Sequence, residues 1–172
     1  MKVLFVVAPS NFRDEELFQT KEVLESSGIS VEIASTRKGI AKGMLGGRVE
    51  VSKLVSEVNV LEYDGVVFVG GSGVEEHLLY ENKDIISLAK KAYANKKVVA
   101  AICIAPRILA RAGILTGKKA TVFPDKDSIA ILEGVGVVYI PSAVVVDEKI
   151  VTANGPTAAR SFGDAIVSVL KK

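Results

Sequence analysis

The sequence predicts an α/β fold: a flavodoxin-like, three-layer arrangement in which a doubly wound, mostly parallel sheet carries helices on both faces. Three short apolar runs, at residues 2–8, 65–69 and 97–102, are typical of parallel strands that are buried on both sides. Each run ends in a turn, and a helical pattern follows. This alternation predicts right-handed crossovers within one sheet, and ligands of such sheets bind beyond the carboxyl ends of the strands.

The first helix is expected soon after the first strand, which Pro9-Ser10-Asn11 ends. Asp14 is placed to cap this helix, and Ser26-Ser27-Gly28 closes it. Glu15 and Glu16 then lie in the first turn, where carboxylates complement the helix dipole. We expect Glu15 to be a surface residue.

The next segment contains short strands and a glycine-rich turn. Residues 30–34 alternate as a second strand, and the glycine-rich stretch 39–51 indicates a short β excursion. After the strand at 65–69 comes Gly-Gly-Ser-Gly, followed by helical patterns over 74–79 and 82–94. The turn lacks the Lys-Ser/Thr pair of a phosphate-binding loop and the full spacing of a dinucleotide fingerprint, so we do not assign it to phosphate binding.

The second half of the chain continues the alternation with shorter elements. The expected elements are an extended run at 119–122, a helix over 125–133, extended runs at 137–139 and 143–152, and a last helix after Gly155-Pro156. We expect the last two extended runs to form a hairpin, with Asp147-Glu148 as a tight turn.

Cys103 lies where the strand over 97–102 ends and Pro106 opens an amphipathic helical pattern. A nucleophile elbow, the sharp strand-to-helix turn that exposes a reactive side chain, needs small residues two positions before and after its centre. Ala101 and Ala105 meet that need. The N–H groups and the dipole of the following helix favour a thiolate, so we expect a lowered thiol pKa and a nucleophilic sulfur.

Composition narrows the class of protein. A length of 172 residues indicates one domain over 1–172, and a single cysteine excludes an internal disulfide. The net charge is +2 and the basic residues are scattered, so we expect no nucleic-acid partner. The longest uncharged apolar run, 98–106, is shorter than the roughly 18 residues of a membrane helix. We expect a cytoplasmic protein without a metal constellation.

Several motifs in this order resemble those of the DJ-1/PfpI superfamily, which includes the parkinsonism-associated deglycase and PfpI-type intracellular peptidases. The matching segments are Val-Leu-Phe-Val-Val-Ala-Pro with Glu15-Glu16-Leu17, then Val-Phe-Val-Gly-Gly71, Val-Ala-Ala-Ile-Cys103-Ile-Ala-Pro106, Gly-Ile-Leu-Thr-Gly-Lys-Lys-Ala-Thr, and Gly155-Pro156. They extend over nearly the whole chain, and their combination is specific.

The resemblance implies roles for four residues. Cys103 would be the nucleophile, and Glu16 would lie beside it, share a proton with it and act as a proton shuttle. A neutral carboxyl can donate a hydrogen bond to a thiolate, so we expect Glu16 to keep its proton more readily than a free glutamate. The backbone N–H groups of Gly71 and Ile104 would donate to a developing oxyanion.

The departures from the family pattern concern histidine. Peptidase-like members carry His directly after the cysteine, where this chain has Ile104, and other active members place His where this chain has Phe123, before Pro124. The only histidine is His77, for which a surface or subunit-contact role is expected, although a neighbouring subunit could deliver it. Without an imidazole, protonation of an amine leaving group is difficult, which disfavours peptide hydrolysis.

The leading hypothesis is that Cys103 and Glu16 act on small carbonyl compounds, α-oxoaldehydes in particular, or on glycated protein, in glyoxalase-like or deglycase-like chemistry. Thiolate addition to an aldehyde needs no strong leaving-group acid. The alternative is an oxidation-sensing or chaperone-like stress protein with little turnover. A cysteine peptidase or amidase is less favoured. We expect no cofactor, and the resemblance implies a homodimer or a higher homo-oligomer.

Overall fold

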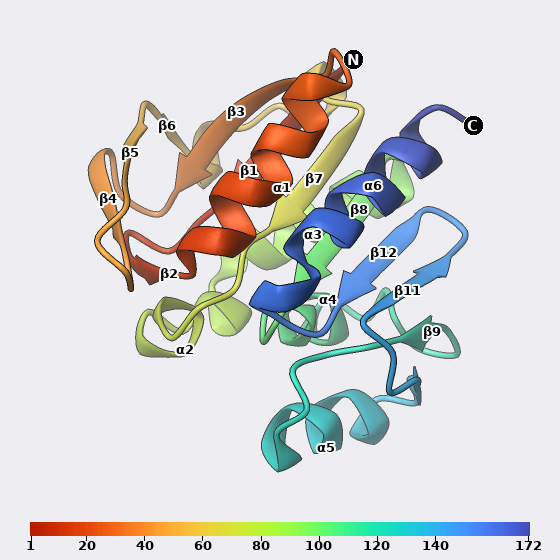
Figure 1. The fold of residues 1–172 in the computed structure, drawn as a ribbon. Helices are drawn as coiled ribbons and strands as arrows, with labels where there is room; N and C mark the ends of the chain where they lie inside the picture. The colour runs from red at the N-terminus through yellow and green to blue at the C-terminus, as the bar shows by residue number, and fades with distance from the viewer.

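Seven strands form the central sheet of the computed structural model, which describes all residues, 1–172. Their order across the sheet is β11-β12-β8-β7-β1-β3-β6 (Figure 1). The strands are β1 (Lys2–Val6), β3 (Ser30–Ser35), β6 (Lys53–Leu54), β7 (Gly65–Phe68), β8 (Val98–Ile102), β11 (Val144–Asp147) and β12 (Ile150–Ala153). All neighbours pair in parallel except β11, which runs antiparallel to β12. The predicted doubly wound, mostly parallel sheet is confirmed.

The three apolar runs recognised in the sequence are the centre of this sheet. Strands β7 and β8 are buried at every residue, and β1 is buried after Lys2. In the register of the sheet, Phe5 of β1 lies between Ile33 of β3 and Val67 of β7. Helices cover both faces of these strands, so neither face needs polar side chains, and the runs are apolar without alternation.

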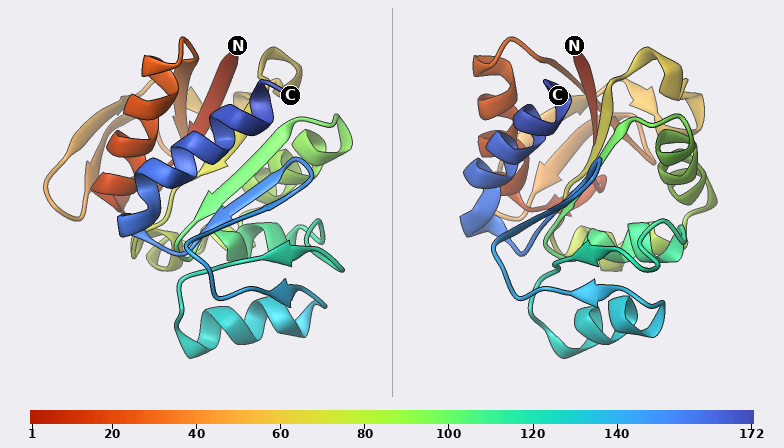
Figure 2. Two further views of the ribbon diagram at one scale, coloured as in Figure 1. Left: turned by 45° about the vertical axis from the view of Figure 1, so that its right-hand side comes forward. Right: turned by 90° about the vertical axis from the view of Figure 1, so that its right-hand side faces the viewer.

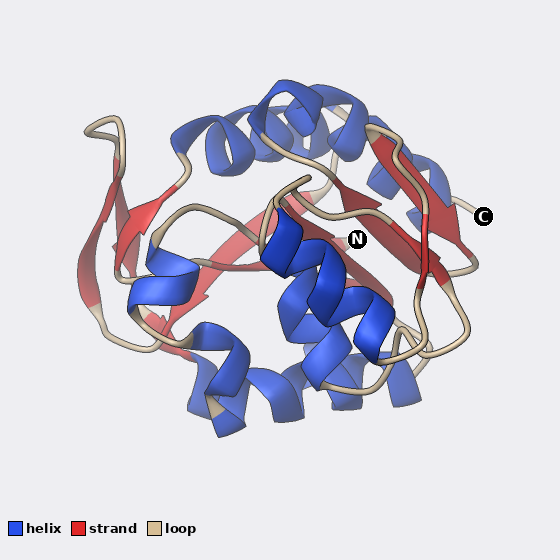
Figure 3. Ribbon diagram, turned by 90° about the horizontal axis from the view of Figure 1, so that it is seen from below, coloured by secondary structure: helices blue, strands red, loops and turns tan.

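The helices lie on both faces of the sheet (Figures 2 and 3). On one face α1 (Asp14–Ser26) packs beside α6 (Ala159–Leu170); on the other lie α3 (Lys83–Ala94) and α4 (Pro106–Arg111). Helix α1 approaches α6 closely at Gly163, where an added Cβ would lie 2.8 Å from Cβ of Val23. Thr20 of α1 donates a hydrogen bond to the carbonyl of Ala159 over 3.1 Å. Helices from the two ends of the chain, α1 and α6, thus form one layer.

Shorter elements complete the chain, and one of them corrects an expectation while another confirms one. The predicted helix over 74–79 is only α2 (Gly73–Glu76) followed by a 3-10 turn, and the helix near 125–133 is α5 (Lys126–Gly134), capped by Asp125. The 3-10 turn after α2 is Leu79–Glu81, and the others are Val55–Glu57, Val60–Glu62 and Pro156–Ala158. No helix in the chain combines the length and the apolar character needed to cross a membrane.

The β excursion expected near residues 39–51 is a hairpin of β4 (Gly39–Gly43) and β5 (Arg48–Val51). It forms a three-stranded sheet with β2 (Ser10–Phe12), which pairs in parallel with β4. The Pro9-Ser10-Asn11 stretch does follow the first strand, but Ser10 and Asn11 are themselves part of β2, a strand that the sequence did not predict. β2 forms because it pairs with β4, about 30 residues further along the chain, and the residues near β2 in sequence do not indicate that pairing.

The C-terminal hairpin is also smaller than expected. It consists of β11 and β12 alone, which come from the predicted run at 143–152 and the next residue, Ala153. Glu148 and Lys149 form the turn between them. The run at 137–139 is not part of it. As β10 (Val138–Tyr139), that run pairs in parallel with β9 (Lys119–Ala120). The prediction that the runs at 137–139 and 143–152 pair with each other is therefore wrong. The first run pairs with β9, and the second folds back on itself.

Asp14 is the first residue of α1 and does not cap it, since Arg13 occupies the capping position without a side-chain hydrogen bond. The Asp14 carboxylate instead accepts hydrogen bonds from the backbone N–H groups of Leu45 and Gly47, each over 2.7 Å. Both donors lie in the loop between β4 and β5. Asp14 thus joins the start of α1 to the hairpin, a long-range use of the carboxylate that replaces the expected local one.

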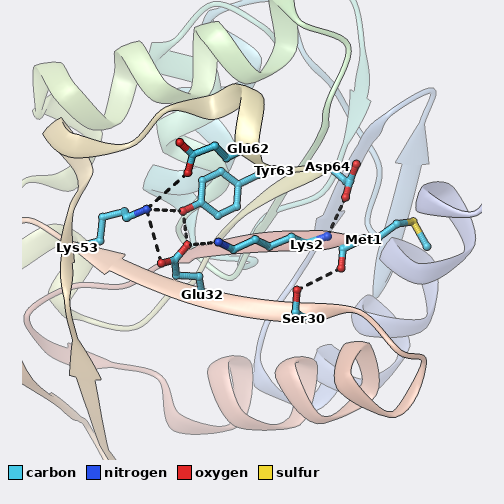
Figure 4. Close-up of polar contacts among 8 residues, drawn as sticks. All are labelled: Met1, Lys2, Ser30, Glu32, Lys53, Glu62, Tyr63 and Asp64. Carbon is cyan, nitrogen blue, oxygen red and sulfur yellow. Dashed lines mark hydrogen bonds and ion pairs between the residues drawn. The ribbon is translucent and has the colours of Figure 1, made fainter.

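Polar contacts also connect strands on the β1 side of the sheet (Figure 4). Glu32 of β3 pairs with Lys2 of β1 over 2.8 Å and with Lys53 of β6 over 3.6 Å, and it accepts a hydrogen bond from the Tyr63 hydroxyl. The Lys2 ammonium lies 5.0 Å from the centroid of the Tyr63 ring. These partners, first of all the hydrogen bond from Lys2, lower the pKa of Glu32 to about 2.

Candidate active site

Cys103 occupies the turn between β8 and α4, in the left-handed backbone conformation with φ of +64°. This conformation is strained for a residue with a side chain. Two backbone hydrogen bonds hold it: the Cys103 N–H donates to Ala153 over 2.9 Å, and the Phe123 N–H donates to the Cys103 carbonyl over 2.8 Å. Ala101 and Ala105 are fully buried on either side. The predicted strand-to-helix elbow is therefore present.

The sulfur opens into a pocket of about 230 Å³ beyond the carboxyl ends of β1, β7 and β8. The lining residues come from six separate segments of the chain: Arg13, Glu16, Met44, Gly71, Ser72, Cys103, Ile104, Phe123 and Pro156. The structure thus brings together all four residues that the sequence singled out. A larger hollow of about 600 Å³ lies at the other ends of the strands, beside Met1 and Val98, and contains none of them.

Glu16 projects from the first turn of α1 and is fully buried. Its Oε2 accepts a hydrogen bond from the backbone N–H of Gly70 over 2.9 Å, and its Oε1 has no nitrogen or oxygen partner. Burial raises the pKa of Glu16 to about 8, against the opposing effects of hydrogen bonds to Cys103 and Gly70. The expectation that Glu16 keeps its proton more readily than a free glutamate is confirmed.

The expectation of a lowered thiol pKa is wrong. Cys103 is only 9% exposed, and burial raises the pKa of its thiol, with the Glu16 charge as the next cause. The backbone N–H groups of Gly71 and Ile104 act in the opposite direction, but burial outweighs them. Local sequence indicated the helix dipole and the N–H donors, whereas the loss of water around the sulfur depends on how distant segments pack over it.

The two expected oxyanion donors, the backbone N–H groups of Gly71 and Ile104, lie close enough to the sulfur to act against the rise in the thiol pKa. Gly71 has φ of +108°, and a Cβ there would collide with the backbone of Asn11 and Arg13. Only glycine fits this position, because the chain before α1 passes directly over it.

Gly70 is a site residue that sequence analysis did not single out. Its N–H holds Glu16, and a Cβ at Gly70 would lie 2.5 Å from both the Glu16 Oε2 and the Cβ of Cys103. The signal was present in the double glycine after β7, but only the three-dimensional arrangement distinguishes the role of Gly70 from that of Gly71.

Arg13 is a second missed residue, and it is one of two ionisable side chains, with Glu16, that line the pocket beside the cysteine. Its backbone N–H donates to the Gly70 carbonyl over 3.0 Å. Its Nε and Nη2 donate to the two carboxylate oxygens of Glu15 over 2.8 and 3.1 Å. Glu15 is thus half-buried in an ion pair with Arg13, which corrects its expected position on the surface.

The comparison with protein families matches residues 1–169 to the model described as the DJ-1/PfpI family. The chain belongs to the DJ-1/PfpI family. This confirms the resemblance that the sequence motifs carried.

Members of the DJ-1/PfpI family are similar to this chain over its full length. A protein of Methanocaldococcus jannaschii described as uncharacterised is 47% identical over 171 residues, which span 99% of this chain and 83% of that protein. A deglycase of Pyrococcus horikoshii is 36% identical over 172 residues, spanning 99% of this chain and 100% of the relative. A glutathione-independent glyoxalase of Caenorhabditis elegans is 27% identical over 98% of this chain and 88% of its own length.

The fold of the DJ-1/PfpI family is equally evident from solved structures. A ThiJ/PfpI domain protein from Brachyspira murdochii superposes with a TM-score of 0.94 at 38% identity, and the match covers 99% of this chain and 96% of that one. The central sheet and its surrounding helices are thus those of the family.

Ile104 and Phe123, the two positions at which the resemblance implies an imidazole in other members, are apolar in this chain. Ile104 and Phe123 both line the pocket. His77 does not line it, and its Nε2 lies 2.7 Å from Oγ of Ser10 in a hydrogen bond. No group of three or more His, Cys, Asp or Glu side chains lies close enough together to hold a metal ion.

Proposed function

We propose that this DJ-1/PfpI protein is a cysteine-dependent enzyme that converts small α-oxoaldehydes, or the adducts they form on proteins, by glyoxalase-like or deglycase-like chemistry. The observation that carries the proposal is the pocket in which the Cys103 sulfur, a protonated Glu16 and two backbone N–H donors converge. The deglycase and glyoxalase names of two relatives support the same class of chemistry.

Cys103 and Glu16 titrate as a coupled pair in this proposal. Burial raises the pKa of both groups, so the pair carries two protons at low pH and loses the first one near the Glu16 pKa of about 8. The remaining proton resides mainly on the sulfur, because Cys103 keeps the higher pKa, and its transfer to the Glu16 carboxylate gives a neutral carboxyl beside a thiolate. Since a neutral carboxyl donates to a thiolate and a carboxylate repels it, this arrangement is the reactive one.

The thiolate adds to the aldehyde carbon, and a sulfur–carbon bond forms. The aldehyde oxygen accepts hydrogen bonds from the Gly71 and Ile104 N–H groups and takes the proton from Glu16. The Glu16 carboxylate then removes the hydrogen on the former aldehyde carbon as a proton and returns it to the neighbouring ketone carbon through an enediol. Water hydrolyses the resulting thioester to a 2-hydroxy acid and releases Cys103. The aldehyde is oxidised, the ketone is reduced, and one water is added.

The two other functions considered from the sequence have less support. An oxidation sensor would depend on the same Cys103 thiolate as the proposed enzyme, and the deglycase and glyoxalase names of two relatives favour turnover. A peptidase needs a group that protonates an amine, and neither Ile104 nor Phe123 can do so. A subunit partner remains a prediction from the family resemblance.

Methylglyoxal turnover to lactate, followed by an enzymatic lactate assay, tests the proposal. Wild type is expected to exceed Cys103→Ser and Glu16→Gln by at least about 100-fold, since each removes a reacting group. Glu22→Gln is a matched control, because Glu22 lies on the same helix but is exposed and pairs with Arg160. Equal rates for wild type and Cys103→Ser would refute the enzyme assignment.

A further inference from the structure

Arg13 gives the pocket a charge that the proposed reaction on a neutral aldehyde does not use. At neutral pH Glu16 is protonated, since burial raises its pKa to about 8, so Arg13 is the single charged group among the nine lining residues. Three other lining residues, Met44, Ile104 and Phe123, are apolar. The pocket therefore combines one cationic group with apolar side chains around one sulfur.

The guanidinium group of Arg13 still has free donors that can face a ligand. Of its five N–H donors, one on Nε and one on Nη2 are bonded to Glu15, and Nη1 makes no hydrogen bond or ion pair. The free edge formed by Nη1 and Nη2 has the fork geometry that binds a carboxylate with two parallel hydrogen bonds.

The position of Arg13 is set by the same segments that build the reactive centre. Its backbone N–H donates to Gly70, its neighbour in sequence begins α1, and Glu15 holds its side chain at 29% exposure. Because the group is already ordered before a ligand arrives, little rotamer entropy is lost on binding. A volume of about 230 Å³ lies below the roughly 300–1,000 Å³ of sites for drug-sized ligands, so the ligand is small.

We propose that Arg13 selects substrates that carry an anionic end group, so that the preferred substrates are small α-oxoaldehydes with a terminal carboxylate. This inference rests on the proposed function for its chemistry. The carboxylate binds the free edge of Arg13 while the aldehyde carbon meets Cys103. For 4,5-dioxopentanoate the product is 2-hydroxyglutarate: the aldehyde becomes a carboxylate, the ketone becomes an alcohol, and one water is added.

The charge preference is tested without turnover by two alkylating reagents of nearly equal size, iodoacetate and iodoacetamide. In both reactions a bond forms between Sγ and carbon, and iodide leaves. The ratio of the two rate constants at Cys103, followed by intact mass, is expected to fall about 10-fold in Arg13→Gln, because the anionic reagent loses its charge-assisted hydrogen bonds. Arg13→Lys keeps the positive charge but loses the forked guanidinium, so its ratio is expected to lie between those of wild type and Arg13→Gln.

Two further variants separate a binding role from a structural one. Arg160→Gln removes the same charge from an exposed ion pair with Glu22, outside the pocket, and is expected to leave the ratio within about 2-fold of wild type. Glu15→Gln removes the counter-charge of Arg13 and is expected to raise the ratio, whereas a purely structural role for the ion pair predicts no rise. An unchanged ratio in a folded Arg13→Gln protein would overturn the proposal.

Turnover of 4,5-dioxopentanoate and of its neutral methyl ester completes the test. The acid is expected to have the higher kcat/KM in wild type, with the preference lost in Arg13→Gln mainly through KM. If neither compound nor methylglyoxal reacts faster than with Cys103→Ser, the proposed function fails, but the alkylation ratio still decides the role of Arg13. If methylglyoxal reacts and the acid has no advantage over its ester, the proposed function stands and the selectivity of Arg13 is refuted.

Discussion

Cys103 and Glu16 lie on either side of Gly70, and the space between them has no room for a side chain on that residue. The Gly70 N–H donates to the Glu16 carboxyl, and a Cβ on Gly70 would lie 2.5 Å from atoms of both side chains. The nucleophile and its proton partner, from distant parts of the chain, are thus spaced by a third segment. The missing side chain at residue 70 is what allows their contact.

Gly70→Ala is therefore expected to separate the pair. A methyl group must displace Glu16 or Cys103, because one of its other neighbours is the backbone carbonyl of Ile102. We expect methylglyoxal turnover to fall at least about 10-fold and stability to fall by roughly 1–3 kcal/mol, measured by urea unfolding. Gly134→Ala is the matched control, because Gly134 lies in α5 with open space around its Cβ position. A fully active Gly70→Ala protein would contradict this role.

The reactivity of Cys103 is expected to increase with pH near 8. Burial raises the pKa of Glu16 to about 8, so the coupled pair loses its first proton there and the Glu16 carboxylate can accept the thiol proton as the sulfur attacks. The rate of iodoacetamide alkylation, followed by mass between pH 6 and pH 10, measures this transition. In Glu16→Gln the transition is expected at higher pH, since the buried thiol has lost its proton acceptor. A profile with its midpoint below pH 7 in wild type would conflict with the buried pair.

The stability of the folded chain is expected to respond to the same titration. The folded-state pKa of Glu16 is raised above its ordinary value, so its contribution to stability is complete below about pH 4.5 and is lost as the pH rises through about 8. The free energy of unfolding of wild type, relative to Glu16→Gln, should therefore fall between pH 5 and pH 8.5. Glutamine stays neutral, so the variant lacks this dependence. Parallel pH profiles for the two proteins would disprove the assignment.

Glu32 is expected to show the opposite dependence. Its partners, with the hydrogen bond from Lys2 first, lower its pKa to about 2, so its contribution is present above about pH 4.5 and is lost as the pH falls toward 2. Because Glu32 is partly solvated, we expect Glu32→Gln to cost only about 1 kcal/mol at pH 7, and less at pH 3, in urea unfolding. Glu57→Gln, which breaks an exposed pair with Lys38, is the control and should change stability by less than about 0.5 kcal/mol.

The sequence by itself determined the features that depend on neighbouring residues. The buried strands follow from continuous apolar runs, and the turn at Cys103 follows from Ala101, Ala105 and Pro106. Each requires only that a residue suits its immediate backbone or that a segment is uniformly apolar. Glu16 and Gly71 were found through motifs of the family, and the structure places both beside the sulfur.

Only the tertiary structure decided the properties that arise when distant segments meet. The thiol pKa rises because packing removes water from Cys103, although the local turn favours a thiolate. Asp14 binds the β4–β5 loop and does not cap its helix, and Arg13 lies in the pocket because its backbone bonds to Gly70. Desolvation and long-range hydrogen bonds depend on which groups become neighbours in space, and a pattern read along the chain does not contain that information.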